Sequence, residues 1–152
     1  MMKKILFILV IGMGLLSLAA CGSGTGAGSD SDTGSASGDT ITGVIWQWVS
    51  VVNQDTNDTT AVPDPAKYTI EFNEDGTFTG KADCNQIAGT YSTENGFSIT
   101  LGPSTLAFCG EASLDTTYLD LLSNIAAGGP DGTGGLALET AGGQQRMLFI
   151  QG

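Results

Sequence analysis

From Val44 onward the chain is divided into short segments of alternating or β-branched residues, most of them followed by a turn signal. Trp46 and Trp48, two residues apart, would point to the same face of a strand. Asn73–Gly76 and Asn95-Gly96 are typical hairpin turns. This pattern favours a mainly antiparallel sheet, in which neighbouring strands pair and bury their apolar faces. We expect about seven or eight short strands, including residues 44–52, 68–72, 77–80, 87–91, 97–101, 136–138 and 147–150.

One segment has helical periodicity instead, and it predicts a helix over residues 114–127. Ser113 is expected to be the N-cap, and Asp115 lies in the first turn, where the helix dipole favours a negative charge. Gly128-Gly129-Pro130 would end the helix. We therefore expect a mainly β domain with one helix (α+β), built as an antiparallel, barrel-like sheet capped by that helix. The apolar face of the helix consists of Leu114, Tyr118, Leu121, Leu122 and Ile125.

The N-terminus carries the pattern of a bacterial lipoprotein signal. Lys3 and Lys4 precede an apolar stretch that ends in Leu18-Ala19-Ala20-Cys21, a lipobox. A transmembrane anchor is the first alternative, but the stretch is shorter than the roughly 20 apolar residues that a spanning helix needs. A soluble secreted protein is the second alternative, and the position of Cys21 argues against it. We expect cleavage before Cys21 and lipidation of that cysteine.

The lipobox divides the chain into three expected regions. Residues 1–20 are the signal peptide, residues 21–39 a lipidated tether, and residues 40–152 a folded domain. The tether contains only small and polar residues after Cys21, so it cannot bury a core and should be a flexible spacer. This organisation predicts a domain on the extracytoplasmic side of the cell membrane or the outer membrane.

The charge and the composition exclude several classes of function. The chain has 5 basic and 16 acidic residues, with a net charge of −11 and no histidine. Removing the signal peptide would take away two lysines and no acid, leaving a formal charge of −13. Nucleic acid is therefore a poor partner, and attraction to anionic lipid headgroups is unfavourable. Without histidine, Ser-His-Asp and Cys-His catalysis and the common histidine-bearing zinc sites are excluded.

The acidic segments do not form a recognisable metal site. Asp55, Asp58 and Asp64 could suggest calcium, but they lack the order of an EF-hand loop. Residues 131–135 have the look of half a calcium-binding repeat, which a single copy cannot stack. We expect solvated loops and turns at both places. We also expect no cofactor, and a monomer attached to the membrane through the lipid on Cys21.

Two cysteines remain once Cys21 is lipidated, and they form an even pair in an exported protein. A disulfide between Cys84 and Cys109 is favoured because an oxidising compartment allows it. Two separate buried thiols are one alternative. A metal site is another, although two thiolates without histidine would need carboxylates to complete a zinc shell.

Several of these segments together resemble the META domain family, which includes HslJ-like heat-shock proteins. Residues 82–91, with Cys84-Asn85 followed by Gly89 and Tyr91, are similar to its first cysteine motif. Residues 101–109 are similar to its second block, which ends in a cysteine, and residues 113–122 are similar to the helix that follows. The resemblance covers nearly all of residues 44–150.

The resemblance implies a small, exported, often lipid-anchored module with a barrel-like β fold that is associated with envelope stress. It supplies no catalytic residues. The family usually has an aromatic strand soon after the helix, whereas residues 126–135 are rich in glycine here. This difference weakens the expectation of one strand and of complete barrel closure.

These observations lead to a main hypothesis and an alternative. The main hypothesis is a non-enzymatic, lipid-anchored envelope protein that acts in binding or stress protection. The alternative is a small-ligand binding module whose barrel mouth is lined by Trp46, Trp48 or Phe97. An enzyme ranks last, because no acid–base pair with a reason for a shifted pKa is recognisable.

Overall fold

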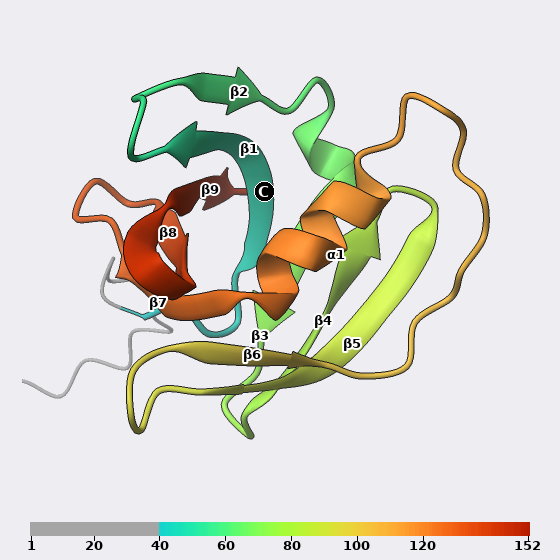
Figure 1. The fold of residues 1–152 in the computed structure, drawn as a ribbon. Helices are drawn as coiled ribbons and strands as arrows, with labels where there is room; N and C mark the ends of the chain where they lie inside the picture. Colours follow the sequence, from blue (N-terminus) through green and yellow to red (C-terminus); the bar gives the residue numbers. More distant parts are fainter. Residues whose placement is uncertain (1–39) are drawn as a thin grey trace, which may run out of the picture. The chain divides into compact units, whose positions relative to one another are not determined.

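The computed structural model describes residues 40–152, which form one antiparallel sheet and one α-helix (Figure 1). The residues expected as a lipidation site and tether, including Cys21, lie outside the described residues. The elements are β1 (Ile45–Asn53), β2 (Thr59–Ala61), β3 (Tyr68–Phe72), β4 (Thr77–Ala82), β5 (Asn85–Ser92), β6 (Ser98–Leu101), α1 (Asp115–Ser123), β7 (Ile125–Pro130), β8 (Leu136–Thr140) and β9 (Gln145–Gln151), with short 3₁₀ turns at Pro65–Lys67 and Ala141–Gly143.

The sheet has the strand order β6-β5-β4-β3-β1-β9-β8-β7, and β2 pairs with β1 in addition. All strand pairs are antiparallel, and most join strands that are neighbours in sequence. The two predicted hairpin turns join β3 to β4 and β5 to β6. The pairing of β1 with β9 is different, because it joins the two ends of the domain and places Trp48 opposite Phe149. This long-range pairing curls the sheet into a nearly closed barrel (Figure 1).

Strand β7 forms where the sequence predicted the end of a helix and a glycine-rich stretch. The helix ends at Ser123, and the chain enters β7 at Ile125 and pairs with β8. Gly128 lies so close to Leu138 that a Cβ there would be 2.5 Å from a methyl carbon of that side chain and 3.3 Å from the Phe97 ring. Glycine therefore permits the strand here by allowing close approach. The prediction of a helix to residue 127 was wrong because the glycines were interpreted as a stop signal.

The edges β6 and β7 lie at the two ends of the strand order and do not pair along their lengths. The doubt about complete closure is confirmed in this sense, since the barrel is nearly but not fully closed. The family's strand after the helix is nevertheless present in this chain. The segment 53–65, expected as a loop, also contains the short strand β2, which pairs with the end of β1.

The interior is filled by two groups of aromatic rings. In one, the Trp48 ring stacks on Tyr118 at 5.2 Å and meets the edge of Tyr68 at 5.8 Å. In the other, Phe72 contacts Phe97 edge-to-face at 5.5 Å. Burying such rings is the dominant favourable contribution to the stability of a small domain. Because Tyr118 belongs to α1 and Trp48 to β1, the first group attaches the helix to the barrel.

Helix α1 packs its buried residues Tyr118, Leu121 and Leu122 onto the barrel, as the periodicity predicted. Its N-cap is Leu114 and not Ser113, and no side chain caps it. The Ser113 hydroxyl still accepts a hydrogen bond from the Asp115 amide at 3.2 Å, so it satisfies one free amide of the first turn. Within residues 40–152 no helix has the length and apolar character needed to cross a bilayer.

Replacing Tyr118 with phenylalanine is expected to raise the free energy of unfolding by about 1 kcal/mol. The Tyr118 hydroxyl is buried and has no hydrogen-bond partner within the described residues, and burial raises its pKa. Removing it removes the cost of desolvating an unpaired polar group. Urea unfolding of Tyr118→Phe measures the change.

The matched control is Tyr68→Phe, because the Tyr68 hydroxyl accepts a 2.8 Å hydrogen bond from the Leu114 amide. That variant should be destabilised. If both variants lose stability equally, the Tyr118 hydroxyl has a partner and the expectation is wrong.

Candidate functional site

The two cysteines predicted as a pair form a disulfide. Cys84 lies in the tight turn between β4 and β5, and Cys109 lies in the segment between β6 and α1. Their Cα atoms are 5.6 Å apart, within the range that a disulfide allows. We call residues 102–114 the β6–α1 loop. The bond therefore fixes the middle of this loop to the edge of the barrel.

A single buried side chain also holds this loop through hydrogen bonds. Asn85, at the start of β5, is 1% exposed. Its Oδ1 accepts hydrogen bonds from the Ala107 amide at 2.8 Å and the Thr105 hydroxyl at 3.0 Å. Its Nδ2 donates to the Ala107 carbonyl at 3.0 Å and to Asp115 Oδ2 at 3.3 Å. Asn85 thus pairs both backbone groups of Ala107, a residue that belongs to no strand.

The far end of the loop is held by a polar network beside the disulfide. Asp83 occupies the turn before Cys84 in a left-handed conformation, with φ +56°, which aspartate tolerates better than most residues. Its Oδ1 lies 3.3 Å from Lys67 Nζ, and its Oδ2 accepts a long hydrogen bond from Tyr68. The Ser113 hydroxyl, and to a smaller extent Lys67 and Tyr68, hold the pKa of Asp83 below its ordinary value.

The lowered carboxylate pKa values predict a loss of stability in acid. Hydrogen bonds from Thr77 lower the pKa of Asp75, and those from Thr133 and Gly135 lower that of Asp131, in the same direction as Asp83. Such a group contributes its full stabilisation above its unfolded pKa of about 3.9 and loses it as pH falls through the lower folded value.

We expect the free energy of unfolding to fall below about pH 4. The fall should be smaller in Asp83→Asn than in the wild type. Urea unfolding across this range measures it, with Asp55→Asn, a residue outside the network, as the control. An equal pH dependence in all three proteins would contradict the assignment of Asp83.

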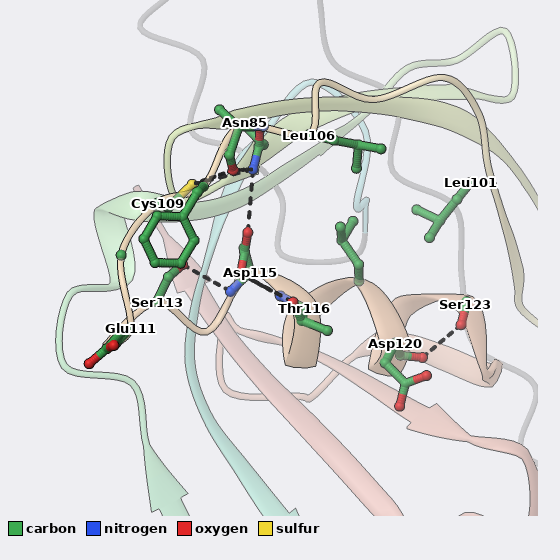
Figure 2. Close-up of a pocket in the computed structure, with 14 residues that line it drawn as sticks. Asn85, Leu101, Leu106, Cys109, Glu111, Ser113, Asp115, Thr116, Asp120 and Ser123 are labelled. Atoms are coloured by element: carbon green, nitrogen blue, oxygen red, sulfur yellow. Dashed lines mark hydrogen bonds between the residues drawn. The ribbon is translucent and has the colours of Figure 1, made fainter.

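A groove of about 820 Å³ lies between the β6–α1 loop and α1. Leu101, Leu106, Phe108 and Leu119 line it with apolar atoms. Figure 2 shows Leu106 and Leu101 projecting into the space above α1, while Asp115 points toward Asn85. Leu106 is 86% exposed and Phe108 is 85% exposed. Exposed apolar side chains that gather in one place mark a candidate interaction surface.

The tryptophans and Phe97 do not line a pocket mouth. Trp46, Trp48 and Phe97 are buried in the core, with the Trp46 and Trp48 indoles donating to the carbonyls of Ile41 and Ser50. The barrel-mouth pocket proposed for these residues is therefore wrong. The rings of these three residues instead fill part of the barrel interior.

The acidic segments considered for calcium are turns. Asp131 Oδ1 accepts hydrogen bonds from the Thr133 amide at 2.7 Å and the Gly135 amide at 2.9 Å, as expected of turn chemistry. Asp58 accepts one from the Thr56 hydroxyl. Among residues 40–152 no three histidine, cysteine, aspartate or glutamate side chains gather as metal ligands.

Sequence reasoning located the two cysteines and placed Asn85 in the first cysteine motif without a role, but it did not single out Leu106 or Phe108. Asn85 next to Cys84 carried a weak signal, since an asparagine beginning a strand is unusual. Leu106 and Phe108 form a short alternating apolar pair after Pro103, which could be a buried strand end as readily as an exposed surface. Only the folded loop shows that both side chains face solvent.

The fold and the site define a class of small antiparallel barrels with one helix and a disulfide-fastened loop before it. The family model of the META domain matches residues 39–151. The chain belongs to the META domain family. No curated protein matches it.

Two solved structures share the fold. A DUF4847 family protein from Bacteroides vulgatus is 17% identical, covers 72% of this chain and 93% of its own, and superimposes with a TM-score of 0.55. A protein from Burkholderia xenovorans, solved by NMR, is 21% identical, covers 74% of this chain and 83% of its own, and has a TM-score of 0.58. At these identities the likeness concerns the fold alone.

Proposed function

We propose that this protein is a non-enzymatic, lipid-anchored protein of the cell envelope. Its META domain binds a partner through the groove between the β6–α1 loop and α1, in a binding or stress-protection role. The protein is a monomer attached through Cys21 to the cell membrane or the outer membrane, with the domain on the extracytoplasmic side. It uses no cofactor.

The exposed pair Leu106 and Phe108 carries the binding part of this proposal. Both side chains are solvent-exposed, yet Asn85 holds the backbone between them at Ala107, and the disulfide holds the next residue, Cys109. A loop ordered before binding loses less conformational entropy when a partner arrives. Holding the exposed Leu106 and Phe108 in place therefore favours binding of a partner, whereas these two side chains add little to the packing of the core.

Two features support the non-enzymatic part. The chain has no histidine to act as a general base near neutral pH. Cys84 and Cys109 are bonded to each other, so neither supplies a thiolate nucleophile. The oxidised pair also supports an exported location, because disulfides persist in oxidising compartments.

The anchor is tested by replacing Cys21 with serine. Cells grown with a labelled fatty acid should incorporate label into the wild type and not into Cys21→Ser, because the thioether linkage needs the cysteine sulfur. Cell fractionation should find the wild type with membranes and the variant as an unprocessed precursor. Label in the Cys21→Ser protein would refute the lipid anchor at this residue.

The binding role is tested by placing a photo-crosslinking amino acid at position 108 in living cells. The matched control is the same amino acid at Ile45, another exposed apolar position at 50% exposure. We expect a discrete adduct from position 108 that is missing from position 45. The same adducts at both positions, or none at position 108, would contradict a binding role for the groove.

A further inference from the structure

Resting on the proposed binding role of this groove, we propose that its partner is a cationic amphipathic segment. Such a segment carries an apolar stripe flanked by lysine or arginine and belongs to another protein or peptide. The groove offers an apolar surface to the stripe and carboxylates without a cationic partner to the lysine or arginine side chains.

The apolar half comes from three elements. Leu106 and Phe108 belong to the β6–α1 loop, Leu101 ends β6, and Leu119 lies on α1. Leu119 and Leu101 are half-buried, whereas the two loop residues are exposed. The surface is therefore open on the loop side and supported on the helix side. A groove of this kind accepts the apolar face of an amphipathic helix.

The acidic half lies around the same groove. Glu111 belongs to the loop, and Asp115 and Asp120 belong to α1. None of the 14 residues that line the groove is lysine or arginine. The two ion pairs within residues 40–152 are Lys67 with Asp83 and Arg146 with Glu139, so these three carboxylates have no cationic partner in the described part of the chain.

The negative charge of the protein argues against two other occupants of the groove, an anionic membrane surface and a second copy of the chain. The whole chain carries a net charge of −11, and an anionic membrane surface would repel it. A second copy of the chain would bring the same acidic residues to the groove, so like charges would face each other. A cationic segment avoids both repulsions, because its lysine or arginine side chains can pair with Glu111 and Asp120, which have no cationic partner in the described residues.

The test uses the full lipidated chain in phosphatidylcholine nanodiscs and a fluorescent leucine–lysine peptide of about 15 residues, long enough to form a helix on binding. Fluorescence anisotropy gives the Kd. Leu106→Ser with Phe108→Ser should weaken binding at least tenfold. Glu111→Gln with Asp120→Asn should weaken it about threefold to tenfold and reduce its salt dependence. Thermal unfolding confirms that each variant is folded.

The matched controls are Ile45→Ser with Ile150→Ser for the apolar pair, since these residues are 50% and 49% exposed elsewhere on the barrel. Glu74→Gln with Glu94→Gln, at two exposed hairpin turns, serves for the charges. Both controls should bind as the wild type does. Empty nanodiscs and a leucine–glutamate peptide should show no binding.

Two results would overturn the proposal. One is binding of the leucine–lysine peptide that the groove variants leave unchanged, or that empty nanodiscs reproduce. The other is a lack of binding to the wild type. If the crosslink at position 108 still forms in cells, the proposed binding role stands and only the cationic partner is wrong.

Discussion

Replacing Cys84 and Cys109 together with serine is expected to lower the free energy of unfolding by about 3.5 kcal/mol. The disulfide joins residues separated by 25 positions, so losing it releases a long segment of the unfolded chain and raises the entropy of the unfolded state. Urea unfolding of the double variant against the wild type measures the change. The reduced wild type should behave like the variant.

Labelling with a thiol reagent provides the control for this result. The unreduced mature protein should show no free thiol at Cys84 or Cys109, and it should show both after reduction. Labelling of both cysteines in the native protein would contradict the bond. A double variant as stable as the wild type would show that the disulfide contributes nothing to the free energy of unfolding.

Replacing Asn85 with alanine is expected to lower the free energy of unfolding by about 3 kcal/mol. The buried side chain accepts a hydrogen bond from the Ala107 amide and donates hydrogen bonds to the Ala107 carbonyl and to Asp115. Removing it leaves several partners unsatisfied and frees the loop that carries Leu106 and Phe108. Hydrogen exchange should show faster exchange of the Ala107 amide.

Gln86→Ala is the matched control, because Gln86 is the exposed neighbour of Asn85 on the same strand. It should change stability by less than about 0.5 kcal/mol. Combining Asn85→Ala with the cysteine double variant should cost less than the sum of the two, since both changes release the same loop. Full additivity would show that Asn85 and the disulfide act on separate parts of the structure.

Much of the fold could be predicted because it depends on local patterns. The turns at Asn73–Gly76 and Asn95-Gly96 join β3 to β4 and β5 to β6 as expected. The late helix and the mainly antiparallel architecture also follow from periodicity. The ordered motifs around Cys84 and Cys109 indicated the META domain, and the family match confirms it.

The errors have one physical origin, which is that contacts distant in sequence override local signals. Gly128 ends a helix in an isolated chain, but against Leu138 and Phe97 it permits β7. Thr59–Ala61 is too short to be recognised as a strand by itself, and pairing with β1 stabilises it. Trp46 and Trp48 are buried, because side chains such as Tyr68 and Tyr118 from other elements fill the interior beside Trp48.

The sequence alone determined the class of fold and the acidic character of the surface, because these depend on composition and spacing. It favoured the pairing of Cys84 with Cys109, and the structure settled that pairing. Only the tertiary structure decided where the loop between β6 and α1 lies. Asn85 and Asp115 are 30 residues apart in the chain, and the curled sheet brings them together. The groove with its exposed Leu106 and Phe108 exists because that long-range contact and the disulfide hold an otherwise unpaired segment in place.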